Sequence, residues 1–203
     1  MKTKTLFLLG ILTAIGVASA EAQNLIQNGS FELNVTGNYT YTPIDWTVSL
    51  SLPLNAYNGV VENSQGPIGP TVPAEDGSYV WYDNGGTSLS QSFATTLGDV
   101  YSLSFYAISA GGSPDINGEI KASITGNADQ TWNNVQNVWT LETEEFTATG
   151  SETTLSLTQL YGGAHDNGAI DNVSVTLEPT PEPSTLTLAA LGGASLLLFR
   201  RRK

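Results

Sequence analysis

The 203-residue chain contains no cysteine and only one histidine, His165. Without cysteine there can be no disulfide, no thiolate nucleophile and no cysteine-ligated zinc or iron–sulfur site. One histidine cannot form a two-histidine zinc centre within one chain, and no Gly-x-Ser-x-Gly segment marks a serine hydrolase. We therefore expect a protein that is not an enzyme.

Basic residues are almost absent from the body of the chain. Six of the seven lie within the first four or the last four residues, and Lys121 is the exception. All 19 acidic residues lie between residues 21 and 183, which gives this stretch a formal charge of −18. Such a body repels nucleic acid and anionic lipid and attracts divalent cations, so we expect no nucleic-acid partner.

The body also lacks any long stretch with helical periodicity. Short runs instead alternate between apolar and polar residues, and Asn-Gly pairs between them are typical of tight turns. Strands are expected at residues 46–50, 57–62, 79–82, 88–94, 101–107, 120–125, 139–147, 155–158 and 173–177. This pattern predicts an all-β antiparallel sandwich or jelly roll over residues 21–177.

The N-terminal segment has the pattern of a secretory signal peptide. Two lysines precede an apolar run over residues 6–17, and small residues follow at 18–20. A charged start, an apolar middle and a small-residue cleavage site direct a chain across the membrane. We expect cleavage after Ala20, with Ala22 as the alternative, so that residues 1–20 are removed and the body is exported.

The C-terminal segment has three parts. A stretch over residues 184–199 is uncharged and rich in Leu and Ala, and as a helix it is about 24 Å long against a hydrocarbon core of about 30 Å. Pro181, Glu182 and Pro183 precede it, and Arg200, Arg201, Arg202 and Lys203 follow it. Basic flanks remain in the cytoplasm, so we expect a transmembrane helix and basic tail at 184–203, after a short, stiff linker at 178–183.

This tail resembles the PEP-CTERM sorting signal of exported bacterial proteins, in which a Pro-Glu-Pro-Ser signature precedes a short apolar helix and an arginine cluster. The resemblance implies that an exosortase, a membrane protease-transpeptidase, processes the chain near the Pro-Glu-Pro. The chain would be held transiently in the inner membrane and would then reach the cell surface or the extracellular matrix. An ordinary C-terminal anchor would give the same topology without processing.

Several short segments of the body carry a second resemblance: Asn24–Glu32, Asp45–Trp46, Asp76–Tyr79, Leu89–Phe93, Gly98–Phe105 and Ala169–Val175. Together they resemble the galactose-binding-like jelly roll of many carbohydrate-binding modules and choice-of-anchor proteins. The resemblance implies an antiparallel jelly-roll β-sandwich. It also makes sugar binding an expectation, although this fold hosts many functions.

Asp171 is the centre of a predicted metal site. It lies in phase with the apolar residues of the last strand, so regular alternation turns it towards the core. A buried carboxylate there needs a proton or a cation, and calcium suits carboxylate and carbonyl oxygens. In the family resembled, the Glu of the opening motif and the Asp of the closing motif bind a structural calcium, which implies Glu32 and Asp171. Backbone carbonyls near Asn28 and a loop acid such as Asp76 are expected to complete the shell. The alternative is a bulge that leaves Asp171 solvated.

Sugar binding requires aromatic rings that stack on pyranose faces, with polar groups for the hydroxyls. The candidate rings are Trp132, Trp81, Tyr82, Tyr57, Tyr161, Tyr39 and Tyr41. Trp132 is the strongest candidate because polar residues flank it in an expected loop over residues 129–134. Trp46 and Trp139 are left out because they resemble core positions of the family. For each single ring, ordinary packing is the competing interpretation.

These patterns predict an exported, exosortase-sorted protein of the bacterial surface or biofilm matrix. We expect it to be non-enzymatic and structural or adhesive, with exopolysaccharide as its partner and a structural Ca²⁺. The first alternative is a dedicated carbohydrate-binding module for a defined glycan, which a saturable glycan affinity would favour. The second alternative is a polysaccharide hydrolase, which would need two carboxylates facing one glycosidic bond.

Overall fold

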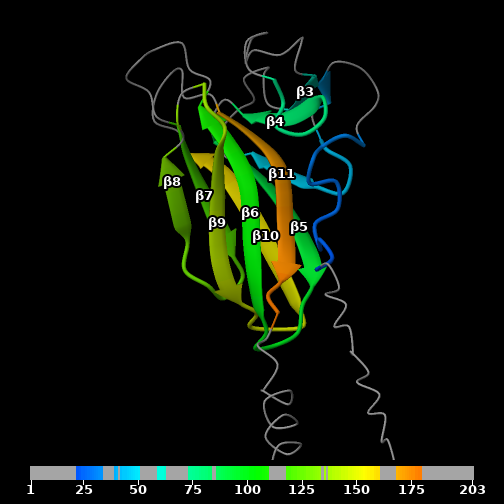
Figure 1. Ribbon diagram of the computed structural model, residues 1–203, viewed down its shortest axis with the longest axis vertical. Helices are drawn as coiled ribbons and strands as arrows, with labels where there is room; N and C mark the ends of the chain where they lie inside the picture. Colours follow the sequence, from blue (N-terminus) through cyan, green and yellow to red (C-terminus); the bar gives the residue numbers. More distant parts are fainter. Residues whose placement is uncertain are drawn as a thin grey trace, which may run out of the picture.

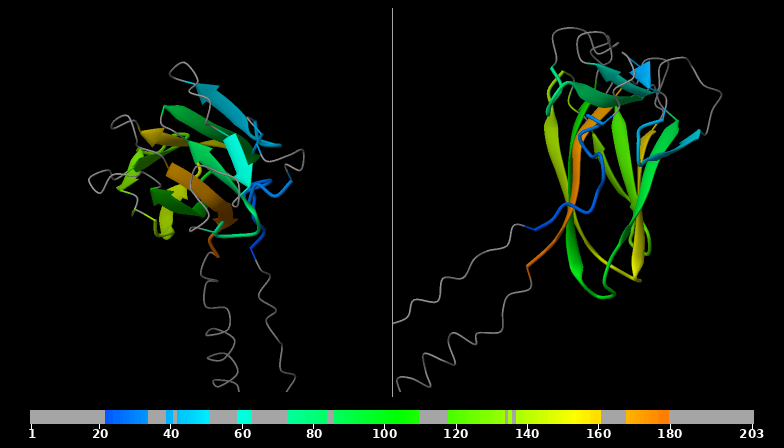
Figure 2. Two further views of the ribbon diagram at one scale, coloured as in Figure 1. Left: turned by 90° about the horizontal axis from the view of Figure 1, so that it is seen from above. Right: turned by 90° about the vertical axis from the view of Figure 1, so that its right-hand side faces the viewer.

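A computed structural model of the chain describes residues 22–33, 39–40, 42–50, 59–62, 73–83, 86–109, 118–133, 135, 137–160 and 168–179. In this part of the chain eleven strands form two antiparallel sheets, and no helix occurs. The two sheets face each other as the layers of a sandwich (Figures 1 and 2). The all-β prediction is confirmed.

The six-stranded sheet has the order β1 (Tyr39–Thr40), β3 (Gly59–Glu62), β4 (Tyr79–Asp83), β11 (Gly168–Leu177), β6 (Val100–Ser109) and β9 (Thr140–Thr147). The five-stranded sheet has the order β2 (Thr47–Leu50), β5 (Thr87–Ala94), β10 (Glu152–Leu160), β7 (Glu119–Ile124) and β8 (Gln130–Asn133). Most neighbours within a sheet are distant in sequence, so each layer is assembled from long-range pairings.

The main core lies between the sheets and follows from the period-two pattern. In β5, β6 and β10 every second side chain is buried, and the residues between them face outwards. Leu89, Leu103, Phe105, Leu155 and Leu157 are among the most completely buried side chains. Burying each such side chain contributes roughly 1.5–3 kcal/mol, which is the main force holding this disulfide-free sandwich together.

The outer face of the five-stranded sheet carries small hydroxyl side chains. Ser88 Oγ and Thr158 Oγ1 lie 2.6 Å apart across β5 and β10, and Ser92 Oγ and Thr154 Oγ1 lie 2.7 Å apart. Cross-strand hydroxyl pairs of this kind stabilise a solvated sheet face. The alternation of Leu with Ser or Thr therefore gives this sheet an apolar inner face and a hydrogen-bonded outer face.

One side of the sandwich is closed by the N-terminal segment, residues 24–29. β4 pairs with β11 only over Gly168–Ile170. Along the rest of β11 the N-terminal segment supplies the hydrogen bonds in place of β4. Leu25 N donates to Val175 O at 2.8 Å, and Val173 N donates to Gly29 O at 2.9 Å. The two described ends of the chain therefore lie next to each other (Figure 2, right).

The opposite side is bounded by β8 and β9, the last strands of the two sheets (Figure 1). The prediction of a loop at 129–134 is wrong, because Gln130–Asn133 pair with β7 as a short strand. Tyr39 likewise belongs to a strand, β1, which pairs with β3.

In the described residues no helix is long and apolar enough to cross a membrane. The predicted signal peptide at 1–20 and the predicted helix and basic tail at 184–203 lie outside the described residues.

Candidate functional site

A loop over residues 73–78, which we call the clamped loop, folds across the outer face of the six-stranded sheet. Beneath it lies a second small apolar cluster of Val80, Tyr82, Ile108 and Ala169, against which Ala74 and Trp139 pack. The Trp139 indole N–H donates to Pro73 O at 2.7 Å and fixes the start of the loop. The loop thus buries one part of a sheet face that would otherwise meet water.

Asp171 fixes the middle of the clamped loop. Its Oδ2 accepts the backbone N–H groups of Glu75 and Asp76, both at 2.9 Å, and its Oδ1 accepts that of Asn172 at 2.7 Å. The residue is 0% exposed. Burial raises the pKa of Asp171 from 3.8 to about 7, although the three N–H donors act in the opposite direction.

The prediction that Asp171 faces the main core is wrong. Asp171 pairs with Tyr106, one residue beyond the inward-facing pair of Ile170 and Ala107, so it lies on the outer face. A bulge follows before Ser174 and restores the register. The bulge was the competing expectation, but Asp171 is not solvated because the clamped loop covers it.

Glu32 fixes the end of the same loop. Its Oε1 accepts the N–H groups of Ser78 and Tyr79, both at 2.7 Å. Gly77 has a φ of 65°, and a Cβ there would lie 2.4 Å from the Glu32 carboxyl carbon, so only glycine fits. Two carboxylates that are 139 positions apart in the chain therefore hold one short loop.

The carboxylate oxygens of Glu32 and Asp171 are of the kind that calcium takes as ligands. The one lysine in the described residues, Lys121, pairs with Asp129 at 3.1 Å, so no described basic side chain neutralises Asp171. Calcium accepts two carboxylates in flexible geometry. In this structure both carboxylates bind backbone N–H groups, and among the described residues no three His, Cys, Asp or Glu side chains gather as a metal-binding group. Calcium therefore stays a prediction.

The other two expected ligands, Asn28 and Asp76, make other contacts in this structure. The Asn28 side chain is engaged on both sides: its Nδ2 donates to Ile44 O at 3.0 Å, and its Oδ1 accepts the Leu33 N–H at 3.1 Å. The Asn28 carbonyl accepts the Trp46 indole N–H at 3.1 Å. The Asp76 side chain is exposed, and its backbone N–H is the group that meets Asp171.

Two of the candidate sugar-binding rings are buried. Trp81 and Tyr82 are each 1% exposed, Trp81 in the main core and Tyr82 under the clamped loop. A ring that stacks on a sugar needs an open face, so the structure removes both from the candidate set. Tyr57, Tyr161 and Tyr41 lie outside the described residues.

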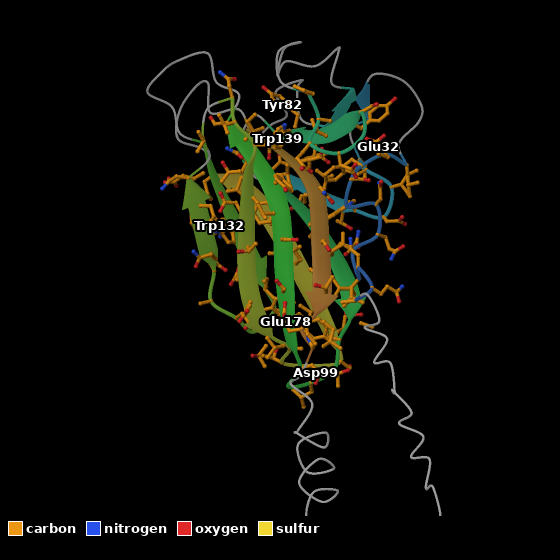
Figure 3. The ribbon with its side chains drawn as sticks, in the orientation of Figure 1. Glu32, Tyr82, Asp99, Trp132, Trp139 and Glu178 are labelled. Carbon is orange, nitrogen blue, oxygen red and sulfur yellow. The ribbon has the colours of Figure 1, made fainter. Side chains whose placement is uncertain are left out.

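Trp132 lies on the β8 side of the sandwich, opposite the side that holds Glu32 (Figure 3). It pairs with Ile120, whose side chain is in the core, so its own ring leans into the gap between the sheets. The ring meets Phe105 edge to face, with 5.3 Å between centroids. Trp132 stays partly exposed, so it both packs and faces solvent.

Two carboxylates on β9 accompany Trp132, and sequence reasoning did not single them out. Glu142 pairs with Phe105 and Glu144 pairs with Leu103, so both point towards the gap between the sheets. Burial raises the pKa of both groups, and nearby Asp129 raises that of Glu144 further. The sequence does contain one indication of their position: both lie on the same face of the expected strand as Phe146, which is buried.

Comparison with known proteins gives one sequence match. Residues 179–203 match the PEP-CTERM protein-sorting motif. The match begins two residues after β11 ends at Leu177. The predicted sorting signal is confirmed for this segment. A comparison with curated protein sequences gives no match.

The described sandwich is similar to several solved structures. TmCBM61, solved in complex with β-1,4-galactotriose, is 17% identical with a TM-score of 0.57, and the match covers 77% of this chain and all of TmCBM61. The CBM22-1 xylan-binding domain of Paenibacillus barcinonensis Xyn10C is 15% identical with a TM-score of 0.50, over 81% of this chain and all of that domain.

A third similar structure is the enzymatically active domain of tailspike protein 4 from bacteriophage CBA120. It is 14% identical with a TM-score of 0.52, over 76% of this chain and 21% of that one. At these identities the likenesses show the fold. They confirm the jelly-roll sandwich of carbohydrate-binding modules, and the same fold also occurs as part of a much longer chain.

Proposed function

We propose that this chain is an exported, exosortase-processed protein of the bacterial cell surface or extracellular matrix. Its β-sandwich binds an exopolysaccharide and does not cleave it. The observation that carries the proposal is the sorting motif at 179–203, which directly follows a sandwich with the fold of carbohydrate-binding modules. The body's charge of −18 keeps such a protein soluble and disfavours adhesion to anionic lipid.

Trp132 is the proposed contact for the polysaccharide. It lies on an edge strand, is partly exposed, and is next to the exposed Gln130. An aromatic face with adjacent amide and carboxylate groups supplies both the apolar and the polar contacts that a sugar ring needs.

Calcium is proposed as a structural ligand of the loop side of the molecule. Glu32 and Asp171 would hold the ion, which would supply the positive charge that the buried Asp171 lacks. With calcium bound, the clamped loop would be fixed through the metal as well as through its backbone N–H groups. The proposed role is therefore stabilisation of the fold, and the ion takes no part in glycan contact.

Two experiments test this function. Co-expression with an exosortase should shorten the exported protein near Pro181 to Pro183, as mass spectrometry would show, and an unshortened product would contradict processing. The exported protein should bind a discrete set of glycans on an array and release no new reducing ends from them. An empty array would refute the binding proposal, and released ends would favour the hydrolase.

Variants on β8 locate the contact. Trp132→Ala should weaken glycan binding at least about tenfold, as loss of a stacked ring implies. Because Trp132 also packs on Phe105, Gln130→Ala serves as a second variant that removes an exposed side chain and leaves the core intact. Thr131→Ala on the opposite face of β8 is the matched control. Equal binding by all three variants would remove this edge from the proposal.

A further inference from the structure

The register of the strands places Trp132 and the β9 carboxylates at matching heights along one edge. Trp132 contacts Phe105, and Phe105 pairs with Glu142, so Trp132 and Glu142 lie at the same level. The next residue on the same face of each strand is Gln130 in β8 and Glu144 in β9, and these two also lie level with each other. The edge therefore presents an aromatic ring, an amide and two carboxylates in two adjacent rows, which we call the β8–β9 edge site.

One acceptor in this site has capacity left. Glu144 Oε2 is shielded from solvent and has no hydrogen-bond partner among the described residues. A buried acceptor without a donor is unfavourable, so a ligand hydroxyl that donates to it would stabilise the complex. Trp132 beside it supplies an apolar face, which a metal ion or a free water molecule would not use.

The charges around the site are predominantly negative. Glu142 and Glu144 face it from β9, and Asp129 lies at the start of β8. The basic group on the neighbouring strand β7, Lys121, is engaged with Asp129. An acidic sugar brought beside these carboxylates must meet a like charge or force a carboxylate to take up a proton, and both cost free energy.

We propose that the β8–β9 edge site selects glycans without acidic groups, with Glu142 and Glu144 accepting sugar hydroxyls and repelling uronic acids. This inference rests on the proposed function, because it assumes that the sandwich binds a polysaccharide. It adds the chemical class of that polysaccharide: a neutral or amino-sugar polymer, as opposed to a polyuronate of the kind that many matrices contain.

Inward-pointing charges on an edge strand have another known use, since they block pairing with the edge of a second molecule. That role accounts for the position of Glu142 and Glu144 on β9. It does not require an exposed aromatic ring beside them, and it predicts a different result when the charges are removed: self-association, with no change in glycan preference.

The test is an array of matched oligosaccharides probed with the exported protein. It carries neutral galactose, glucose, mannose and xylose oligomers, their amino-sugar analogues, and galacturonate, glucuronate and mannuronate oligomers of equal length. The wild type should bind at least one neutral or amino-sugar oligomer at least about tenfold more tightly than the uronate of the same linkage.

Glu142→Gln and Glu144→Gln should reduce that ratio several-fold, because each keeps the shape of the side chain and removes its charge. The matched control is Glu145→Gln, which removes one charge from the outer face of the same strand and should leave the ratio unchanged. An equal effect of all three substitutions would overturn the inference, because net charge alone would then set the preference.

The remaining outcomes separate the two proposals. Preferred binding of uronates by the wild type overturns the inference and leaves the proposed function standing. Binding to no oligomer overturns both. A change only in oligomeric state, measured by size-exclusion chromatography on the Gln variants, assigns the two carboxylates to edge protection and overturns the inference.

Discussion

The buried Asp171 should make the stability of this protein fall with rising pH without calcium, and calcium should flatten or reverse that fall. In the metal-free protein the pKa of Asp171 is raised from 3.8 to about 7. Below the lower value the group is protonated in both the native and the unfolded state. As the pH rises through this window, the unfolded chain ionises while the native protein retains its proton, so the free energy of unfolding falls.

The size of the effect follows from the shift. The full difference corresponds to roughly 4 kcal/mol, and roughly 2.5 kcal/mol of it is lost between about pH 5 and about pH 8. Calcium binds only the ionised carboxylate, so its contribution grows over the same range. Calcium should therefore flatten or reverse the loss of stability.

The assay is urea unfolding followed by tryptophan fluorescence at about pH 5 and about pH 8, in EDTA and in saturating calcium. Asp171→Asn should remove most of the pH dependence in EDTA, because its side chain cannot ionise. Glu152→Gln, which removes an exposed carboxylate, controls for net charge. The reasoning fails if Asp171→Asn has the wild-type slope, and the calcium proposal fails if the ion leaves the wild-type curves unchanged.

Two further predictions concern the folded framework. Gly29→Ala should abolish or severely reduce folding, because its Cβ would lie 2.0 Å from Val173 O, whereas Gly150→Ala meets nothing closer than 3.7 Å; thermal melting of both variants compares them, and equal melting temperatures would contradict the close approach. Trp139→Phe should lower the free energy of unfolding by about 1 kcal/mol, because it removes the hydrogen bond to Pro73; an unchanged urea midpoint would show that this bond does not hold the clamped loop.

Sequence reasoning succeeded where a strand has one buried and one solvated face. The inner residues of β6 and β10 alternate mostly with Ser and Thr, so these strands were predictable. β8 was missed because its four residues, Gln130–Asn133, are mostly polar and include one ring, too little for a period to show. What makes it a strand is its pairing with β7, a tertiary contact.

The candidate sites show the same limit. Trp81 and Tyr82 occupy successive positions of β4: Trp81 is buried in the main core, and Tyr82 is buried because a loop covers the outer face of the sheet there. No local pattern reveals that cover. The orientation of Asp171 depends on a bulge in which Asn172 has a φ of 50°. Asn tolerates this conformation, but the presence of Asn in a sequence does not predict it.

The central position of β11 would have a mechanical consequence under the proposed sorting, in which the chain is held by its C-terminal end. β11 lies between β4 and β6, with the N-terminal segment bonded along its lower half. A pull on the residues after Leu177 would act along this strand, across hydrogen bonds that run perpendicular to it. Those bonds, which β11 makes on both of its sides, would share the load in shear, whereas a pull across the strand would open them one at a time. A pull from this end would thus load both neighbours of β11 at once.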